Sequence, residues 1–159
     1  MIFVAVGTQK FQFNRLLEAI DNLIENKVIT EEVYAQIGHS DYVPQNYKYT
    51  DFLSKDKFES YINRCNLLIT HSGVGTIISG IKCEKPVIVI PRLAKYGEHV
   101  DDHQVQIANS FEEKNYILCV GEKNKLQDMI REAYNHKFDK YISQRENVLK
   151  TIRTFIDSI

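Results

Sequence analysis

The chain has 159 residues, of which 43% are hydrophobic and 26% charged, and this composition predicts a single globular domain over residues 1–159. Its formal net charge of −1 provides no basic field that would hold nucleic acid, so no nucleic-acid partner is expected. The apolar start, residues 1–6, is too short for a signal peptide or a membrane span, and the widely spaced cysteines (Cys65, Cys83 and Cys119) predict buried thiols in a reducing compartment.

The amino-terminal third of the chain alternates strand and helix signals. Ile2–Val6 is an apolar, β-branched run, which predicts a strand buried on both faces. Asn14 can cap a helix whose apolar residues recur at helical spacing: Leu16, Leu17, Ile20, Leu23 and Ile24. Glu32–Ile37 predicts a second strand, and Tyr47–Leu53 predicts a short third one.

The middle of the chain repeats this alternation around a glycine turn. Ser54 can cap a helix whose inner face consists of Phe58, Tyr61, Ile62 and Cys65. Leu67–Thr70 predicts a buried strand, and Pro86–Ile90 predicts the next one. Between these strands lie the turn His71–Thr76 and a segment that we expect to be a helix.

The last third begins with a long polar loop, Arg92–Asp101. Asp101, the last residue of this loop, or Asp102 can cap the helix that follows. Tyr116–Val120 predicts the last strand, and two helices are expected at Lys125–Tyr134 and at about Tyr141–Ile156.

This alternation predicts an α/β fold, namely a Rossmann-like parallel sheet with helices on both faces. Ligands of such sheets bind at the carboxyl ends of the strands. Four polar segments meet at that edge: Gly7-Thr8, Gly38–Ser40, His71–Thr76 and Arg92–Asp102. Function is therefore expected at this edge.

The turn His71–Thr76 has the strongest chemical signal. A helix that starts directly after a glycine turn directs unpaired N–H groups and its positive dipole end at the turn, which predicts a phosphate site. Ser72 and Thr76 can add hydroxyl donors. The turn is neither a P-loop nor a GxGxxG dinucleotide motif, so a tight turn without a ligand stays an alternative.

Histidines and carboxylates flank this edge, and each has a functional and a structural interpretation. His71 can be a catalytic base, a phosphate donor or an ordinary residue at a strand end. A second cluster consists of His99, Asp101, Asp102 and His103. Its spacing is not that of a metal site, and a solvated loop or a hydroxyl-binding cap is favoured.

Further polar residues follow the same pattern. Gln104 can donate and accept hydrogen bonds, which suits sugar hydroxyls, or it is simply an exposed glutamine. Lys10, Arg92 and Lys95 can neutralise a diphosphate, although each is more commonly a solvated charge. No metal or other cofactor is predicted from these residues.

Three motifs at fixed spacing resemble one known family. They are His-x-Gly-x-Gly-Thr at 71–76, Lys-Pro-Val-Ile-Val-Ile-Pro-Arg at 85–92 and Asp-His-Gln at 102–104. Together they resemble the donor-binding half of GT-B glycosyltransferases, of the family 28 carboxyl-terminal type. The chain is most similar to single-domain members: the catalytic subunit of the eukaryotic dolichol-linked UDP-GlcNAc transferase, and bacterial capsular or exopolysaccharide subunits described as β-1,4-galactosyltransferase or glucuronosyltransferase components.

The resemblance implies that the chain binds a UDP-sugar. The amides that hold the diphosphate match Ser72, Gly73, Val74, Gly75 and Thr76, and the loop that closes over it matches Gly7 and Thr8. The segment that reads uracil matches Phe52 and Leu53. The segment that contacts the donor sugar matches Asp102, His103 and Gln104.

Other positions are implied with less detail. Arg92, Lys95 and His99 are implied contacts of the diphosphate or the acceptor. Ser79 stands where the family commonly has a glutamate that binds the ribose hydroxyls. A serine can make one hydrogen bond there but lacks the paired acceptance of a carboxylate.

The resemblance also implies a partner. GT-B enzymes have two Rossmann-like domains, and the acceptor and catalytic base come largely from the other one. We therefore expect a membrane-anchored subunit that supplies the amino-terminal half, and a polyprenyl-diphosphate-linked acceptor. The chain would be cytoplasmic and recruited to the inner face of the cytoplasmic membrane. The helix expected at about 141–156 is a candidate docking element, or it packs on its own domain.

The leading hypothesis is an inverting, metal-independent transfer of a sugar, with galactose favoured, from UDP to a lipid-diphosphate-linked saccharide in capsule or exopolysaccharide synthesis. His71 is its candidate catalytic residue, unless the partner supplies the base. A non-catalytic enhancer that stabilises a transferase is the alternative. An unrelated nucleotide-binding Rossmann module is the third hypothesis.

Overall fold

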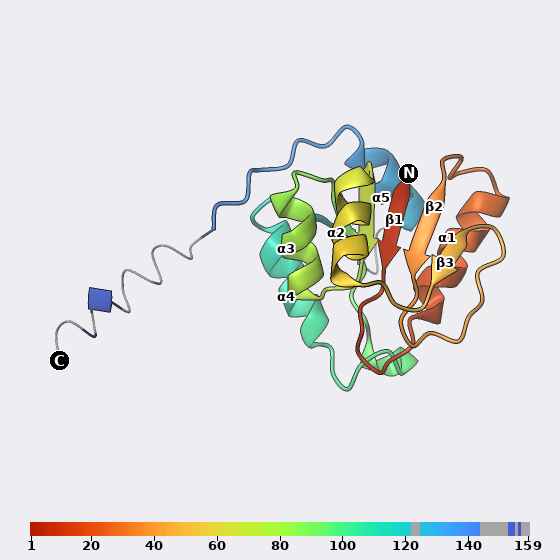
Figure 1. Cartoon of the computed structure of the whole chain (residues 1–159), viewed down its shortest axis with the longest axis horizontal. Helices are drawn as coiled ribbons and strands as arrows, with labels where there is room; N and C mark the ends of the chain where they lie inside the picture. The colour runs from red at the N-terminus through yellow and green to blue at the C-terminus, as the bar shows by residue number, and fades with distance from the viewer. Residues whose placement is uncertain (122–124, 144–152, 155, 157–159) are drawn as a thin grey trace.

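A six-stranded parallel sheet forms the centre of the molecule (Figure 1). The computed structural model describes residues 1–121, 125–143, 153, 154 and 156. The strand order is β3-β2-β1-β4-β5-β6, which confirms the α/β Rossmann-like fold predicted from the sequence. The strands are β1 (Ile2–Ala5), β2 (Val33–Gln36), β3 (Lys48–Thr50), β4 (Leu67–Thr70), β5 (Val87–Val89) and β6 (Leu118–Cys119).

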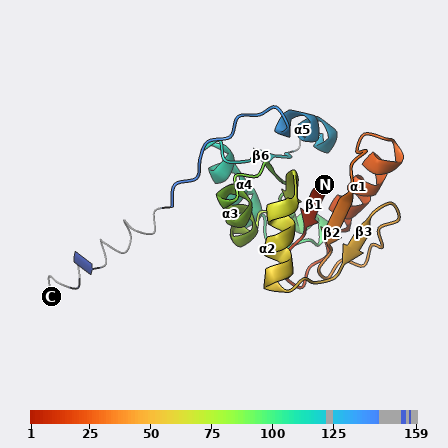
Figure 2. The same cartoon turned by 45° about the horizontal axis from the view of Figure 1, so that its top comes forward.

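Helices cover both faces of this sheet (Figures 1 and 2). One face packs against α1 (Asn14–Glu25) and α5 (Leu126–Ala133), and the other against the remaining helices. These are α2 (Lys55–Arg64), α3 (Val74–Lys82) and α4 (His103–Glu112). Every residue of β1 and β4 is buried because both faces are covered, which explains why these strands are continuous apolar runs.

Helix α3 packs closely against the sheet at Gly80. A Cβ atom at Gly80 would lie 2.7 Å from Leu68 Cδ2 and 2.8 Å from Val87 Cγ2. A side chain at this position would therefore require Leu68 or Val87 to shift. This contact holds the carboxyl-terminal half of α3 against β4 and β5.

Of the helix caps predicted at Ser54 and Asn14, the structure confirms the first and contradicts the second. Ser54 is the N-cap of α2, as predicted, and its hydroxyl accepts from Lys57 N at 3.5 Å. The prediction for Asn14 is wrong, because Phe13 holds the N-cap position of α1 and Asn14 is the first helical residue. The Asn14 side chain instead accepts from Tyr42 N at 3.1 Å and so ties α1 to the loop after β2. An asparagine satisfies a loop amide as well as a helix amide, and the sequence does not distinguish the two.

The polar loop after β5 is more ordered than the sequence predicts. It contains a short 3-10 helix, η1 (Ala94–Tyr96), which ends at Gly97 with a φ of +66°. Asp102 is the N-cap of α4 by position, but its carboxylate accepts from Ala94 N at 2.8 Å instead of from α4. Asp101 accepts from His103 N at 2.9 Å.

The last predicted helix, about Tyr141–Ile156, lies largely outside the described residues. Its first residues, 141–143, have no regular secondary structure, while Arg153, Thr154 and Ile156 are helical. The Tyr141 ring meets the Tyr116 ring edge-on at 5.7 Å, so this residue packs on its own domain. Within the described ranges, no helix is both long and apolar enough to span a bilayer.

The cysteine thiols are free, and two of the three are buried. Burial raises the pKa of the Cys119 thiol to about 12 and also raises the pKa of Cys65. Cys83 is only partly buried. Thiols with raised pKa values are poor nucleophiles, so Cys65 and Cys119 act as small core residues.

Candidate functional site

A cavity of about 720 Å³ opens at the carboxyl ends of the central strands. The chain runs outward from β1 to β3 on one side and from β4 to β6 on the other, so β1 and β4 flank the point where the strand order reverses. Open parallel sheets bind their ligands at this point. Among the sequence-predicted residues, the cavity brings together Gly7, Thr8, Leu53, His71, Ser72, Gly73, Val74, Gly75, Thr76, His99, His103 and Gln104.

The turn after β4 presents unpaired backbone donors to this cavity. Helix α3 begins at Val74, and its N-cap Gly73 has no side chain to cap it. The first helical amide that has a partner at this end is Ile77 N, which donates to Gly73 O at 3.0 Å. The amides of Val74, Gly75 and Thr76 are left without intrahelical acceptors, and they carry the positive end of the helix dipole. This arrangement suits an anion.

Ser72 contributes its side chain to this turn, and not its amide. Ser72 N already donates to Gln104 Oε1 at 3.2 Å, so it is not a free donor for a diphosphate. The Ser72 side chain is fully buried, and its Oγ has no hydrogen-bond partner among the described residues. An unpaired buried hydroxyl costs free energy, and a ligand oxygen in the cavity would supply the missing partner.

The His71 ring is held in one tautomer. Its Nδ1 lies 3.2 Å from Thr70 Oγ1 and 3.4 Å from Ala5 O. The Thr70 hydroxyl donates to Ala5 O at 2.6 Å, so Oγ1 offers only lone pairs to His71. Both neighbours of Nδ1 are therefore acceptors, and we infer that Nδ1 carries the proton while Nε2 is an acceptor.

The environment of His71 also keeps the ring neutral. The side chain is only 7% exposed. Burial, and then the positive charge of Arg92, lower the pKa of His71 to about 4. The ring lies between two glycines, since a Cβ at Gly7 or at Gly73 would come within 2.6 Å of it. The ring is therefore neutral at pH 7 and its Nε2 can accept a hydrogen bond, while a pKa of about 4 makes it a weak general base.

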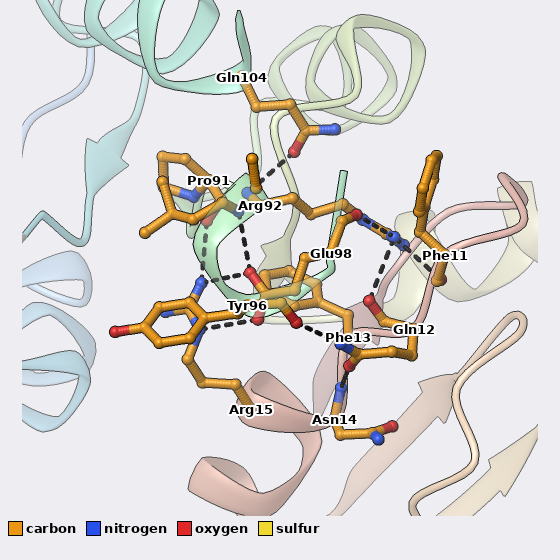
Figure 3. A network of polar contacts seen from close by, with 12 residues as sticks. Phe11, Gln12, Phe13, Asn14, Arg15, Pro91, Arg92, Tyr96, Glu98 and Gln104 are labelled. Atoms are coloured by element: carbon orange, nitrogen blue, oxygen red, sulfur yellow. Dashed lines mark hydrogen bonds and ion pairs between the residues drawn. The ribbon is translucent and has the colours of Figure 1, made fainter. Parts of the chain in front are cut away.

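Gln104 has a more restricted role than the sequence predicts. Its Oε1 accepts from Arg92 N at 3.1 Å (Figure 3). The same oxygen accepts from Ser72 N at 3.2 Å, so Gln104 joins the ends of β4 and β5. The oxygen is therefore occupied by the backbone. Only the amide nitrogen of Gln104 can bind a ligand, and it can only donate.

Arg92 lies away from the cavity, although the sequence predicts it as a diphosphate contact. Its side chain is 1% exposed, and its guanidinium donates to the carbonyls of Phe11, Gln12 and Glu98 (Figure 3). It also donates to Val6 O. Burial lowers the pKa of Arg92 to about 10. This side chain joins the loop after β1 to the loop after β5, and its role is structural.

Glu98 completes this buried network. Its carboxylate is fully buried and accepts from Arg15 Nε and Nη2, each at 2.9 Å, and from Leu93 N at 3.0 Å (Figure 3). The paired guanidinium contact is the strong, two-pronged geometry of arginine with a carboxylate. Glu98 therefore ties the loop after β5 to α1. His99, in the same loop, and His103, at the start of α4, line the cavity.

A comparison with protein families identifies the family of this chain. The pattern of the glycosyltransferase family 28 C-terminal domain matches residues 1–159. The chain belongs to this family. Among solved structures, the solution NMR structure of ALG13 has a TM-score of 0.55 and 18% identity, and the alignment covers 95% of this chain and 93% of that one. The glycotransferase of kitacinnamycin has a TM-score of 0.60 and 18% identity, over 83% of this chain and 33% of that one. At these identities the structures show a shared fold.

Curated relatives align with this chain over only part of their own length. The chain is 29% identical over 98 residues to a UDP-N-acetylglucosamine transferase subunit ALG13 of Candida albicans, covering 62% of this chain and 32% of the relative. It is 30% identical over 106 residues to a UDP-N-acetylglucosamine–N-acetylmuramyl-(pentapeptide) pyrophosphoryl-undecaprenol N-acetylglucosamine transferase of Prochlorococcus marinus, covering 64% and 28%. The chain thus spans about a third of these relatives.

Several predicted contacts of the family 28 site lie outside the cavity. Lys95 and Asp102 line a second hollow, between η1, α4 and the end of β6. Phe52 is exposed and lines a hollow beside α2 that shares Leu53 with the cavity. Ser79 Oγ donates to Gly75 O at 2.9 Å, back along its own helix. Lys10 is exposed on the loop after β1.

Other residues line the cavity without having been predicted: Gln9, Gln36, Lys55, Phe58 and Ile107. Gln36 had a detectable signal, because it is a polar residue at the carboxyl end of an otherwise apolar strand. The others depend on how α2 and α4 lean over the sheet. No group of three potential metal-binding side chains occurs in the part of the chain that the structure describes.

Proposed function

We propose that this chain is the donor-binding subunit of a glycosyltransferase that moves a sugar from a UDP-sugar to a lipid-diphosphate-linked saccharide. The observation that carries the proposal is the set of unpaired donors in one cavity, namely the first amides of α3 and the buried hydroxyl of Ser72. Membership in the glycosyltransferase family 28 C-terminal domain family supports a sugar nucleotide as the source of the anion.

The proposed chemistry is an inverting transfer without a metal ion. Charge develops on the diphosphate as the bond to the sugar breaks, and the amides of Val74, Gly75 and Thr76 already point at it. Donors that are oriented before the reaction stabilise this charge without reorganisation. His71 Nε2 accepts a hydrogen bond from a hydroxyl of the donor or the acceptor, and the partner supplies the base if His71 is too far from the reacting hydroxyl.

For the other ligand contacts, we propose that Gly7 and Thr8 close over the diphosphate. His103 and Gln104 bind the donor sugar, and Gln104 contributes a donor only. For the sugar we propose galactose, because residues 91–104 resemble bacterial capsular subunits. N-acetylglucosamine, which the names of the curated relatives contain, is the alternative.

We also propose a membrane-anchored partner that supplies the amino-terminal half and the polyprenyl-diphosphate acceptor. Curated relatives from Candida albicans and Yarrowia lipolytica are named as subunits of a transferase, which supports a multi-subunit enzyme. The partner would hold the chain at the inner face of the cytoplasmic membrane, where capsule or exopolysaccharide precursors are built.

Calorimetric titration of UDP into the full chain, alone and with the partner, tests the proposal. The matched variant is Gly75→Asp, because a Cβ at Gly75 meets no atom within 4 Å and we therefore expect the variant to fold. A carboxylate at the start of α3 repels the diphosphate, and we expect UDP affinity to fall by about a hundredfold. Failure of the wild-type chain to bind millimolar UDP in both settings would exclude the proposed function.

One observation favours a second function, a non-catalytic enhancer that stabilises a transferase. Ser79 occupies the position of the ribose-binding glutamate, and its hydroxyl is already bonded to Gly75 O. Sugar transfer by the reconstituted pair with His71→Ala or Gln104→Ala separates the two functions. Loss of transfer supports the donor-binding subunit, whereas wild-type rates with both variants support the enhancer.

A further inference from the structure

Gln36 is a buried polar residue at one end of the cavity that the proposed function has not used. It is the last residue of β2, is 3% exposed and lines the cavity together with the apolar side chains of Leu53 and Phe58. The proposed diphosphate site lies after β4, on the other side of β1. Gln36 is therefore at the far end of the cavity from the phosphate-binding amides.

The orientation of the Gln36 amide follows from its single hydrogen bond. Its oxygen accepts from Leu53 N at 3.1 Å. Because Leu53 N can only donate, the group that faces it must be the oxygen and not the nitrogen. The amide nitrogen then points elsewhere, and no acceptor is assigned to it among residues 1–121 and the other described ranges. Among the described residues, the fully enclosed side-chain atoms without a partner are Ser72 Oγ and Arg92 Nε, so the Gln36 nitrogen is open to the cavity that it lines and can donate to a ligand carbonyl there.

We propose that Gln36 determines the choice of nucleobase by donating from its amide nitrogen to O4 of uracil. This inference rests on the proposed binding of a UDP-sugar. Neighbouring strands are about 4.8 Å apart, so the ends of β2 and β4 are separated by roughly 10 Å, the scale of a ribose and a pyrimidine ring. With the diphosphate at α3, the edge of the base opposite the glycosidic bond reaches Gln36, and in uracil that edge carries O4.

The same geometry excludes cytosine. Cytosine has an amino group in place of O4, so two donors would face each other and both would lose their hydrogen bonds to water. A buried polar group without a partner costs enough free energy to change affinity by about tenfold or more. The apolar side chains of Leu53 and Phe58 would pack against either base, so the preference between the bases comes from Gln36.

Gln104 provides a matched control. It lies in the same cavity, is also buried, and also has its oxygen occupied by backbone amides. Gln36→Glu and Gln104→Glu are isosteric, and each replaces a donor with an acceptor and adds one negative charge. Both variants weaken nucleotide binding through charge repulsion, but only Gln36→Glu changes the group that faces the base.

The experiment measures the dissociation constants of UDP and CDP by calorimetry for the wild-type chain and both variants, with the partner present if the complex is required for binding. We expect the wild type to prefer UDP by about tenfold or more. Gln36→Glu is expected to lose this preference or to prefer CDP, because its carboxylate accepts from the cytosine amine. Gln104→Glu is expected to keep the wild-type ratio.

Several results would overturn the proposal. One is an unchanged ratio of the UDP and CDP constants in a folded Gln36→Glu. If circular dichroism shows that this variant is unfolded, the affinities of the wild type for UDP and 4-thio-UDP are compared instead. Sulfur is a weak acceptor at the position of O4, so 4-thio-UDP should bind more weakly. Equal affinity for UDP and 4-thio-UDP would overturn the role of Gln36 while leaving nucleotide binding intact. Absence of UDP binding by the wild type would instead exclude the proposed function itself.

Discussion

The turn after β4 and the loop after β5 lie side by side at the edge of the sheet, yet they differ in how far the protein itself satisfies the hydrogen bonds of their polar groups. In the turn, the first amides of α3 and the Ser72 hydroxyl have no protein partners. In the loop, the Arg92 guanidinium donates to four carbonyls and leaves only its Nε without a partner among the described residues, and Glu98 accepts from Arg15 and Leu93 N. The unpaired donors of the turn belong to the cavity and suit a ligand, whereas the paired groups of the loop support the cavity from beside it.

The first prediction concerns the loop. Arg92→Met removes the donor for several buried carbonyls, and we expect the free energy of unfolding to fall by about 3–5 kcal/mol. Urea unfolding at pH 7 measures this change. Lys10→Met, an exposed cation on the adjoining loop, is the control and should stay within about 0.5 kcal/mol of the wild type. A loss below about 1 kcal/mol for Arg92→Met would contradict a structural role.

The second prediction concerns His71. Its pKa is lowered from 6.5 to about 4 in the folded protein, so the unfolded chain takes up this proton first as the pH falls. The stabilisation is therefore fully present above pH 6.5 and is lost progressively down to about pH 4, by up to about 3 kcal/mol.

Urea unfolding between pH 7.5 and 4.5 measures this dependence, with His71→Gln as the comparison, since an amide can keep a donor towards Ala5 O. The variant should show a flatter profile than the wild type over this range. Identical profiles for the two proteins would mean that His71 takes up its proton equally in the folded and unfolded states.

The third and smallest effect concerns Ser72. Its hydroxyl is buried without a partner, so Ser72→Ala should leave the free energy of unfolding unchanged or slightly higher. UDP affinity should nevertheless fall by about five- to tenfold, because one hydrogen bond to the diphosphate is lost. Calorimetry and urea unfolding on the same sample test both parts. Lower stability with unchanged UDP affinity would place Ser72 in the support and not in the site.

The order of strands and helices was predictable because each buried strand is a continuous apolar run and each helix repeats its apolar residues at helical spacing. The turn after β4 was predictable too, since glycine and hydroxyl residues between a strand signal and a helix signal are typical of a tight strand-to-helix turn. The cap of α1 was not, because Asn14 bonds equally well to the loop at Tyr42.

The sequence alone determined the fold class and the family, since apolar periodicity and the spacing of residues 71–104 are local properties of the chain. Only the tertiary structure decided which polar residues are free. In the folded protein the side-chain oxygens of Gln36 and Gln104 accept hydrogen bonds from backbone amides, and Arg92 is buried among carbonyls. These outcomes depend on atoms brought together from distant segments, so a residue's type and neighbours in the chain do not reveal whether its hydrogen bonds serve the fold or a ligand.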